Sequence, residues 1–204
     1  MREKPIIFNT EMVKAILEGR KTQTRRIILH YGKTPEHFRR DTFYELRGEL
    51  NNKKGLFTGF VDKSAKYPAV YFKSRYQPGD ILYVRETWTI EDIYYIYKAD
   101  LDDWSHLENL KWCPSIHMPR EAARIFLKVI DVKVERLHDI TEEDAMKEGF
   151  IPDVDLVGDD YKGLFAKDRF IEYWNKLNAK RGYGWNMNPW VWVIEFERLE
   201  GKKC

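Results

Sequence analysis

Apolar residues in this chain fall into short alternating runs more often than into helical stripes. Over residues 124–137, Ile130, Val132 and Val134 alternate with charged residues, which is the period-two pattern of a half-buried strand. Shorter apolar or β-branched runs predict further strands at 5–8, 24–29, 69–72, 81–85, 94–98 and 190–196. We therefore expect a sheet built from several short strands.

Three helices are expected between these strands. The first is capped by Asn9 or Thr10 and ends at Gly19, which can adopt positive φ. The second, over 141–148, opens on a capping box, and the third, over 165–178, carries an aromatic face. Strands and helices do not alternate regularly, which predicts an α+β domain around a small mixed or antiparallel sheet curled into a barrel.

Composition narrows the class of protein. The 204 residues, 43% of them hydrophobic, suit one domain that can bury a core of its own. The two cysteines, Cys113 and Cys204, form neither a disulfide framework nor a zinc motif, so no metal or cofactor is expected. Because no apolar run reaches the roughly 20 residues of a membrane-spanning helix and no signal peptide is evident, we expect a soluble, cytoplasmic protein.

Charge is unevenly placed, although the net charge is only +2. Residues 1–40 hold ten Lys and Arg against four Asp and Glu, whereas residues 131–172 hold six against thirteen. The basic part could meet an anionic ligand, or both parts could be solvated surfaces. Aromatic residues make up 15% of the chain, and their faces can pack in a core or stack on nucleobases.

The segment from Gly19 to Arg26 concentrates the candidate chemistry. It places the amine of Lys21 three positions before the hydroxyl of Thr24, and two guanidinium groups follow. A hydroxyl beside a base can act as a nucleophile, and arginines can hold a phosphate or an oxyanion. The alternative is structural, with Lys21 an exposed cation at a helix end, Thr24 a strand former and Glu148 a solvated helix residue.

In its motifs and their order the chain resembles the ASCH domain family of the PUA-like superfamily. The family motif Gly-x-Lys-x-x-Glu-x-Arg stands here as Gly19, Lys21, Thr24 and Arg26, with Thr in place of Glu. Three further segments are similar to later family elements: 79–84, 140–149 and 190–196. The resemblance implies one domain over residues 5–199, a PUA-like small mixed β-barrel with flanking helices.

Insertions separate the matching segments. They lie at about 31–68, 88–118 and 151–163; the first is polar and could hold a hairpin, and the last is an acidic loop. In size the chain looks closer to the larger ASCH members found in bacterial genomes and prophages, for which the resemblance implies no settled activity. Any of the insertions could cover the cleft of the barrel or change its substrate.

A compact bacterial branch of the family also carries Lys-x-x-Thr and hydrolyses the amide of N(4)-acetylcytidine. By similarity, Lys21, Thr24 and Glu148 would be the catalytic residues here.

Two mechanisms of hydrolysis stay open. Lys21 could act as a base for Thr24, which requires a lowered lysine pKa that a neighbouring Glu148 would oppose. Alternatively, Glu148 acts as the base on water while Lys21 stabilises the oxyanion.

PUA-like domains commonly bind RNA beside the barrel, so the resemblance implies RNA or a nucleoside as partner. Candidate phosphate contacts are Arg26, Lys73, Arg75, Arg85 and Arg120, and candidate stacking faces are Trp88, Tyr183 and Trp185. Glu86 is a second candidate carboxylate for the cleft. Binding of RNA or a modified nucleoside is the first hypothesis, the amidohydrolase the second, and a metal-independent ribonuclease, an activity of some ASCH proteins, the third.

Overall fold

The computed structural model describes residues 3–29, 42–50, 53–61, 70–101, 110–157 and 160–200. The strands are β1 (Glu3–Ile7), β2 (Gln23–Ile27), β3 (Thr42–Leu50), β4 (Lys53–Val61), β5 (Val70–Lys73), β6 (Ile81–Arg85), β7 (Trp88–Glu91), β8 (Tyr94–Tyr97), β9 (Phe126–Arg136), β10 (Asp153–Val157), β11 (Asp160–Leu164) and β12 (Trp190–Arg198). The α-helices are α1 (Thr10–Leu17), α2 (Glu142–Lys147) and α3 (Ala166–Asn178), and 3-10 turns lie at Lys98–Asp100, Ser115–His117, Arg120–Ala122, Leu137–Asp139, Ala179–Arg181 and Trp185–Met187. The α+β class expected from the sequence is confirmed.

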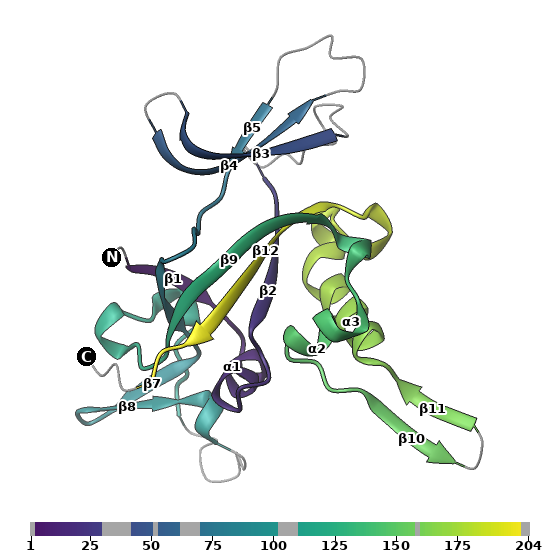
Figure 1. Ribbon diagram of the computed structural model, residues 1–204. Coiled ribbons are helices and arrows are strands. Elements are labelled where there is room, and N and C mark those ends of the chain that lie inside the picture. The colour runs from purple at the N-terminus through teal and green to yellow at the C-terminus, as the bar shows by residue number, and fades with distance from the viewer. Residues whose placement is uncertain are drawn as a thin grey trace.

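Five strands form the central sheet, in the order β1-β6-β9-β12-β2. β1 runs parallel to β6, and the other neighbours are antiparallel, so the sheet is mixed. Figure 1 shows β9 and β12 as a pair of long, strongly curved strands at the centre of the molecule. A register shift between Glu195 and Phe196 breaks the β12 ladder, and such a bulge increases the local twist and bend.

The two edge strands of this sheet, β1 and β2, are joined by a side chain. Arg26 Nη2 in β2 donates a hydrogen bond of 2.9 Å to the carbonyl oxygen of Ile7 in β1. No backbone ladder pairs these two strands within the described ranges. The sheet is therefore curled, but no closed barrel is found in the part of the chain that the structure describes.

Both faces of the central sheet are covered by apolar side chains. On one face, Val132 of β9 and Ile194 of β12 belong to the buried cluster that contains Val13 of α1. On the other face, Val193 of β12 packs in a second cluster with Phe170 of α3. Neighbouring residues of a strand point to opposite faces, which explains how one strand serves both clusters. α1 and α3 consequently lie on opposite sides of β12.

The local signals at the helix ends are confirmed. Asn9 Oδ1 accepts a hydrogen bond of 2.9 Å from the backbone N–H of Met12 and so caps α1. The hydroxyl of Thr141 accepts one of 3.1 Å from the backbone N–H of Asp144 at the start of α2. Gly19, after α1, has a φ of +76°.

The insertions form strands of their own. β3 and β4 make a hairpin that β5 extends into a second sheet, placed above the central sheet in Figure 1. The hairpin expected in 31–68 is confirmed, and residues 30–41 and 62–69 lie outside the described part. β7 and β8 form a hairpin in the second insertion, of which 102–109 are not described.

The expectation of an acidic loop at 151–163 is wrong. β10 and β11 pair there as an antiparallel hairpin, which projects at the lower right of Figure 1. The sequence carries the signal for a strand, because Val154 and Leu156 alternate with Asp153 and Asp155.

Candidate functional site

Lys21 is positioned by the turn that ends α1. The backbone N–H groups of Arg20 and Lys21 both donate to the carbonyl of Ala15, at 2.9 and 3.0 Å, and Gly19 makes this tight turn possible. The chain thereby folds back over the end of the helix before it enters β2. Lys21 is only 3% exposed, so its interpretation as a solvated helix-end cation is wrong.

Glu148 lies at the C-terminal end of α2 and is 4% exposed, so its interpretation as a solvated residue is also wrong. The next residue, Gly149, has a φ of +100°, and a Cβ atom there would lie 2.9 Å from Ala15 Cβ and 3.2 Å from Lys21 Cβ. Glycine is therefore required for the ends of α1 and α2 to approach each other this closely. The sequence predicts that the second helix ends at 148 but gives no sign of this contact.

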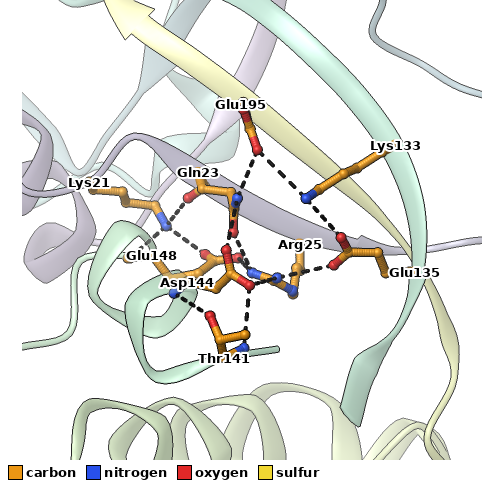
Figure 2. Close-up of polar contacts among 9 residues, drawn as sticks. All are labelled: Lys21, Gln23, Arg25, Lys133, Glu135, Thr141, Asp144, Glu148 and Glu195. Carbon is orange, nitrogen blue, oxygen red and sulfur yellow. Dashed lines mark hydrogen bonds and ion pairs between the residues drawn. The ribbon is translucent and has the colours of Figure 1, made fainter. Parts of the chain in front are cut away.

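The amine of Lys21 and the carboxylate of Glu148 are in direct contact. Lys21 Nζ donates hydrogen bonds to Glu148 Oε2 at 2.8 Å, to the Glu148 carbonyl at 2.7 Å and to the Gln23 carbonyl at 2.8 Å (Figure 2). An ammonium group has three protons, so all of its donors are in use. Burial lowers the pKa of Lys21 from its usual value, and the charge and hydrogen bond of Glu148 oppose that shift.

Arg25 extends this contact into a buried network. Its Nη1 donates to Gln23 Oε1 at 2.6 Å and lies 3.4 Å from Glu148 Oε1. Its Nη2 lies 3.3 Å from a carboxylate oxygen of Glu135 in β9 and 3.3 Å from one of Asp144 in α2. The Arg25 side chain has no exposed area. One guanidinium group thus ties α2 to β2 and β9, as Figure 2 shows.

The sequence did not indicate this network, because the two guanidinium groups that follow Thr24 suggested only contacts with a phosphate or an oxyanion. The strand period does hold a signal: Gln23 and Arg25 are two apart and therefore share a face of β2. The same face carries the neighbouring ion pairs of Lys133, which lies 2.8 Å from Glu135 and 3.8 Å from Glu195. What the sequence could not indicate is that α2 lies on this face with Asp144 and Glu148 directed toward Arg25.

Thr24 occupies the opposite face of β2 from Arg25. It is paired across the ladder with Ile194 and is 4% exposed. Its hydroxyl has no hydrogen bond to any described residue, and none joins it to Lys21 Nζ, whose protons are directed elsewhere. Because Thr24 also lines a cavity, this hydroxyl is available to a ligand.

Lys21, Thr24 and Glu148 line one cavity of about 450 Å³, which we call the Lys21 cavity. Its other walls come from the β1–α1 junction, from β2 and from α3, including Phe8, Asn9, Met12, Arg25, Arg26, Phe170, Tyr173, Trp174 and Asn178. β2 is an edge strand, and the cavity follows its free edge, so residues from both faces of the strand reach it. The structure thus brings together the three residues that the family resemblance selected as catalytic.

A second cavity of about 580 Å³, which we call the basic cavity, lies between β1 and β2. Four of the five candidate phosphate contacts line it: Arg26, Lys73, Arg75 and Arg85. The two cavities share part of their lining, namely Ile7, Arg26, Ile27 and Leu29. Arg26 is therefore the charged residue common to both.

The structure places Arg120, Glu86 and the candidate stacking residues elsewhere. Arg120 forms an ion pair with Glu3. Glu86 is 1% exposed and lies 3.0 Å from Arg124; burial raises its pKa, and Arg124 opposes that shift. Trp88 packs against a buried cluster that contains Met118 and Phe126, and Trp185 stacks on His138. Glu86, Trp88, Arg120, Tyr183 and Trp185 line neither the Lys21 cavity nor the basic cavity.

Comparisons with family models, with curated proteins and with solved structures found no match to this chain. Within the described ranges, no group of three or more His, Cys, Asp or Glu residues could hold a metal ion, and no helix is long and apolar enough to span a membrane. The function is therefore argued from the geometry of the two cavities.

Proposed function

We propose that this protein binds RNA or a modified nucleoside in the Lys21 cavity, on a curled sheet of the ASCH and PUA-like type. The observation that carries the proposal is the convergence of Lys21, Thr24 and Glu148 on one cavity. Two of these residues are 127 positions apart and in contact, and the third presents to the cavity a hydroxyl that forms no hydrogen bond with a described residue. The family resemblance selects the same three residues independently of the coordinates.

The size and lining of the Lys21 cavity suit a nucleobase. Its volume of about 450 Å³ lies within the range of small-molecule sites. Tyr173 and Trp174 supply aromatic groups, while Thr24 and Asn178 supply hydrogen-bonding groups for the edge of a base. Unstacked bases are recognised in proteins by this combination of aromatic faces and polar edges. Arg26 at the border with the basic cavity is in position to contact a phosphate.

Hydrolysis of an acylated cytidine is the second candidate function, and one observation favours it: a carboxylate, a hydroxyl and an amine line the same cavity. Because all three protons of Lys21 are donated to oxygen atoms, the amine offers no lone pair to Thr24. The geometry favours the mechanism in which Glu148 takes a proton from water. The resulting hydroxide attacks the acyl carbon, the Thr24 hydroxyl donates to the oxyanion while the positive charge of Lys21 stabilises it, and the proton passes to the cytidine amine as the C–N bond breaks.

The experiment is to incubate purified protein with N(4)-acetylcytidine and, separately, with labelled RNA at several salt concentrations. Conversion to cytidine that Thr24→Val and Lys21→Ala abolish would establish the amidohydrolase. A shift of the RNA that weakens steeply with salt, with the nucleoside left intact, would establish binding without hydrolysis. Degradation of the RNA that persists in chelator would instead favour the ribonuclease.

Thr22→Val is the matched control, because Thr22 is exposed and precedes Thr24 by two positions. Thr24→Val keeps the shape of the side chain, so it tests the hydroxyl even if Lys21→Ala fails to fold. Equal behaviour of wild type, Thr22→Val and Thr24→Val toward both probes would refute a role for the Lys21 cavity.

A further inference from the structure

The basic cavity has an unusual charge. Among the described residues that line it, four carry a positive charge and none carries a negative charge. They come from three separate parts of the chain: Arg26 from β2, Lys73 and Arg75 from the end of β5 and the segment directly after it, and Arg85 from the end of β6. The fold therefore gathers cations that are distant in sequence into one concave surface, where their fields add.

Elsewhere in this protein, cations are commonly paired with carboxylates. Lys147 lies 2.7 Å from Glu143, and Lys128 lies 3.2 Å from Glu197. In contrast, none of the four cations of the basic cavity forms an ion pair with a side chain that the structure describes. Within that part of the chain their charge is not compensated, and an anion in the cavity would neutralise it.

Contacts with neutral groups hold these four side chains in place. The Arg26 guanidinium lies 5.5 Å from the centre of the Phe8 ring, and that of Arg75 lies 5.6 Å from the Tyr76 ring. Lys73 Nζ lies 5.4 Å from the Phe57 ring. Aromatic faces orient a cation without cancelling its net charge.

The arginines also keep unused hydrogen-bond donors. Arg85 Nη2 donates to the carbonyl of Ile116, while its Nε is buried without a partner in the described part of the chain. Arg26 donates one hydrogen bond, to Ile7, although a guanidinium group has five N–H donors. Free donors on fixed guanidinium groups suit the oxygens of a phosphate.

We infer that the basic cavity holds a phosphate group of the ligand whose base occupies the Lys21 cavity. The inference rests on the proposed function and deepens it, because it specifies a phosphorylated nucleotide or RNA and not a free nucleoside. Arg26 lines both cavities and contacts the phosphate at their common border. Lys73 and Arg75 line only the basic cavity, so their removal separates the two parts of the site.

The test compares binding of cytidine, cytidine 5′-monophosphate and a short oligocytidylate by calorimetry. The variant Lys73→Ala/Arg75→Ala should bind both phosphorylated probes about tenfold more weakly and cytidine with unchanged affinity. For the oligocytidylate, the slope of log affinity against log salt should become shallower by about 1.4. The control variant Lys128→Ala/Lys147→Ala loses two exposed cations outside both cavities and should match the wild type.

The outcomes separate this inference from the proposed function. If the Lys73→Ala/Arg75→Ala variant loses affinity for both phosphorylated probes, the cavity accepts a phosphate monoester. If it loses affinity for the oligocytidylate alone, the cavity binds a phosphodiester of RNA.

Equal affinity of wild type for cytidine and both phosphorylated probes would overturn the inference while leaving nucleoside binding intact. An equal loss in the control variant, or no binding of either phosphorylated probe, would also overturn it. Phosphate-dependent binding that Thr24→Val leaves unchanged would keep the phosphate site and refute the proposed role of the Lys21 cavity.

Discussion

Lys21 Nζ lies 2.8 Å from Glu148 Oε2, although 127 positions separate the two residues in the sequence. The two side chains are 1% and 6% exposed, so both charges are held away from water. A buried charge is tolerated when an opposite charge and hydrogen bonds compensate it. The contact therefore makes the ends of α1 and α2 interdependent, and the stability of this junction depends on both partners.

Glu148→Gln should lower the free energy of unfolding by about 3 kcal/mol. The amide oxygen can still accept a proton from Lys21, but the buried ammonium loses its compensating charge. Urea denaturation measures the change. The control is Glu143→Gln on the same helix. The side chain of Glu143 is 72% exposed, so this substitution should lower the free energy of unfolding by no more than about 0.5 kcal/mol. Similar losses in the two variants would show that Glu148 does not stabilise the junction as an ion-pair partner.

Replacing both members of the pair should be less harmful than removing one. Lys21→Met leaves the Glu148 carboxylate buried without its amine, and we expect a loss of about 3 kcal/mol. Lys21→Met/Glu148→Leu removes both charges and fills the space with apolar atoms, so it should regain at least about 1 kcal/mol of that loss. The measurement is a double-mutant cycle from urea denaturation. Strictly additive losses would contradict direct coupling.

Gly149→Ala should destabilise the protein far more than Gly19→Ala. Both glycines have positive φ, but a Cβ atom at Gly149 would meet Ala15 Cβ at 2.9 Å, whereas one at Gly19 has nothing within 4 Å. We expect a loss of about 3 kcal/mol at Gly149, from backbone strain and overpacking, and of about 1 kcal/mol at Gly19, from strain alone. Thermal or urea unfolding of the two variants gives the comparison. Equal losses would show that the close helix approach is unimportant.

The stability of the α2 junction should fall at acid pH. Burial alone would raise the pKa of Asp144, but hydrogen bonds from Thr141 and the charge of Arg25 outweigh it, so the pKa lies below the usual 3.8. A carboxyl whose folded pKa is depressed stabilises the fold above its unfolded pKa, and this stabilisation is lost as the pH falls through the folded pKa.

Asp144→Asn should therefore be less stable than wild type at pH 7, and the difference should shrink below about pH 4. Urea denaturation at a series of pH values checks this. Glu143→Gln, at a largely exposed position of the same helix, serves as the control and should follow the wild-type curve closely. A difference between Asp144→Asn and wild type that stays constant down to pH 2 would contradict the assignment.

The local parts of the fold could be predicted because they depend on neighbours in the sequence. The alternation around Val132 identified β9, and the side chains of Asn9 and Thr141 identified the starts of α1 and α2. The same reasoning failed at 151–163, where acidic composition was given more weight than alternation. A high content of charged residues indicates that a segment is solvated, whereas the spacing of its apolar residues indicates its backbone conformation.

The grouping of the candidate residues agrees with the sequence, but their geometry could not be predicted from it. The resemblance to ASCH proteins singled out Lys21, Thr24 and Glu148, and the structure shows them around one cavity. It also shows that Lys21 donates all of its protons to oxygen atoms, which spacing along the chain cannot indicate. Arg25 was overlooked because its importance comes from acidic residues on β9 and α2, which pack against it only after folding.

The sequence by itself determined the α+β class, most of the strands and the identity of the basic and acidic residues, because these follow from short-range periodicity and composition. Only the tertiary structure decided which charged side chains are in contact. The curl of the central sheet brings the edge strands together and places Arg26 between the two cavities, and the missing side chain of Gly149 lets two helix ends touch. Distances between residues so far apart depend on how the elements pack, and no local pattern specifies that packing.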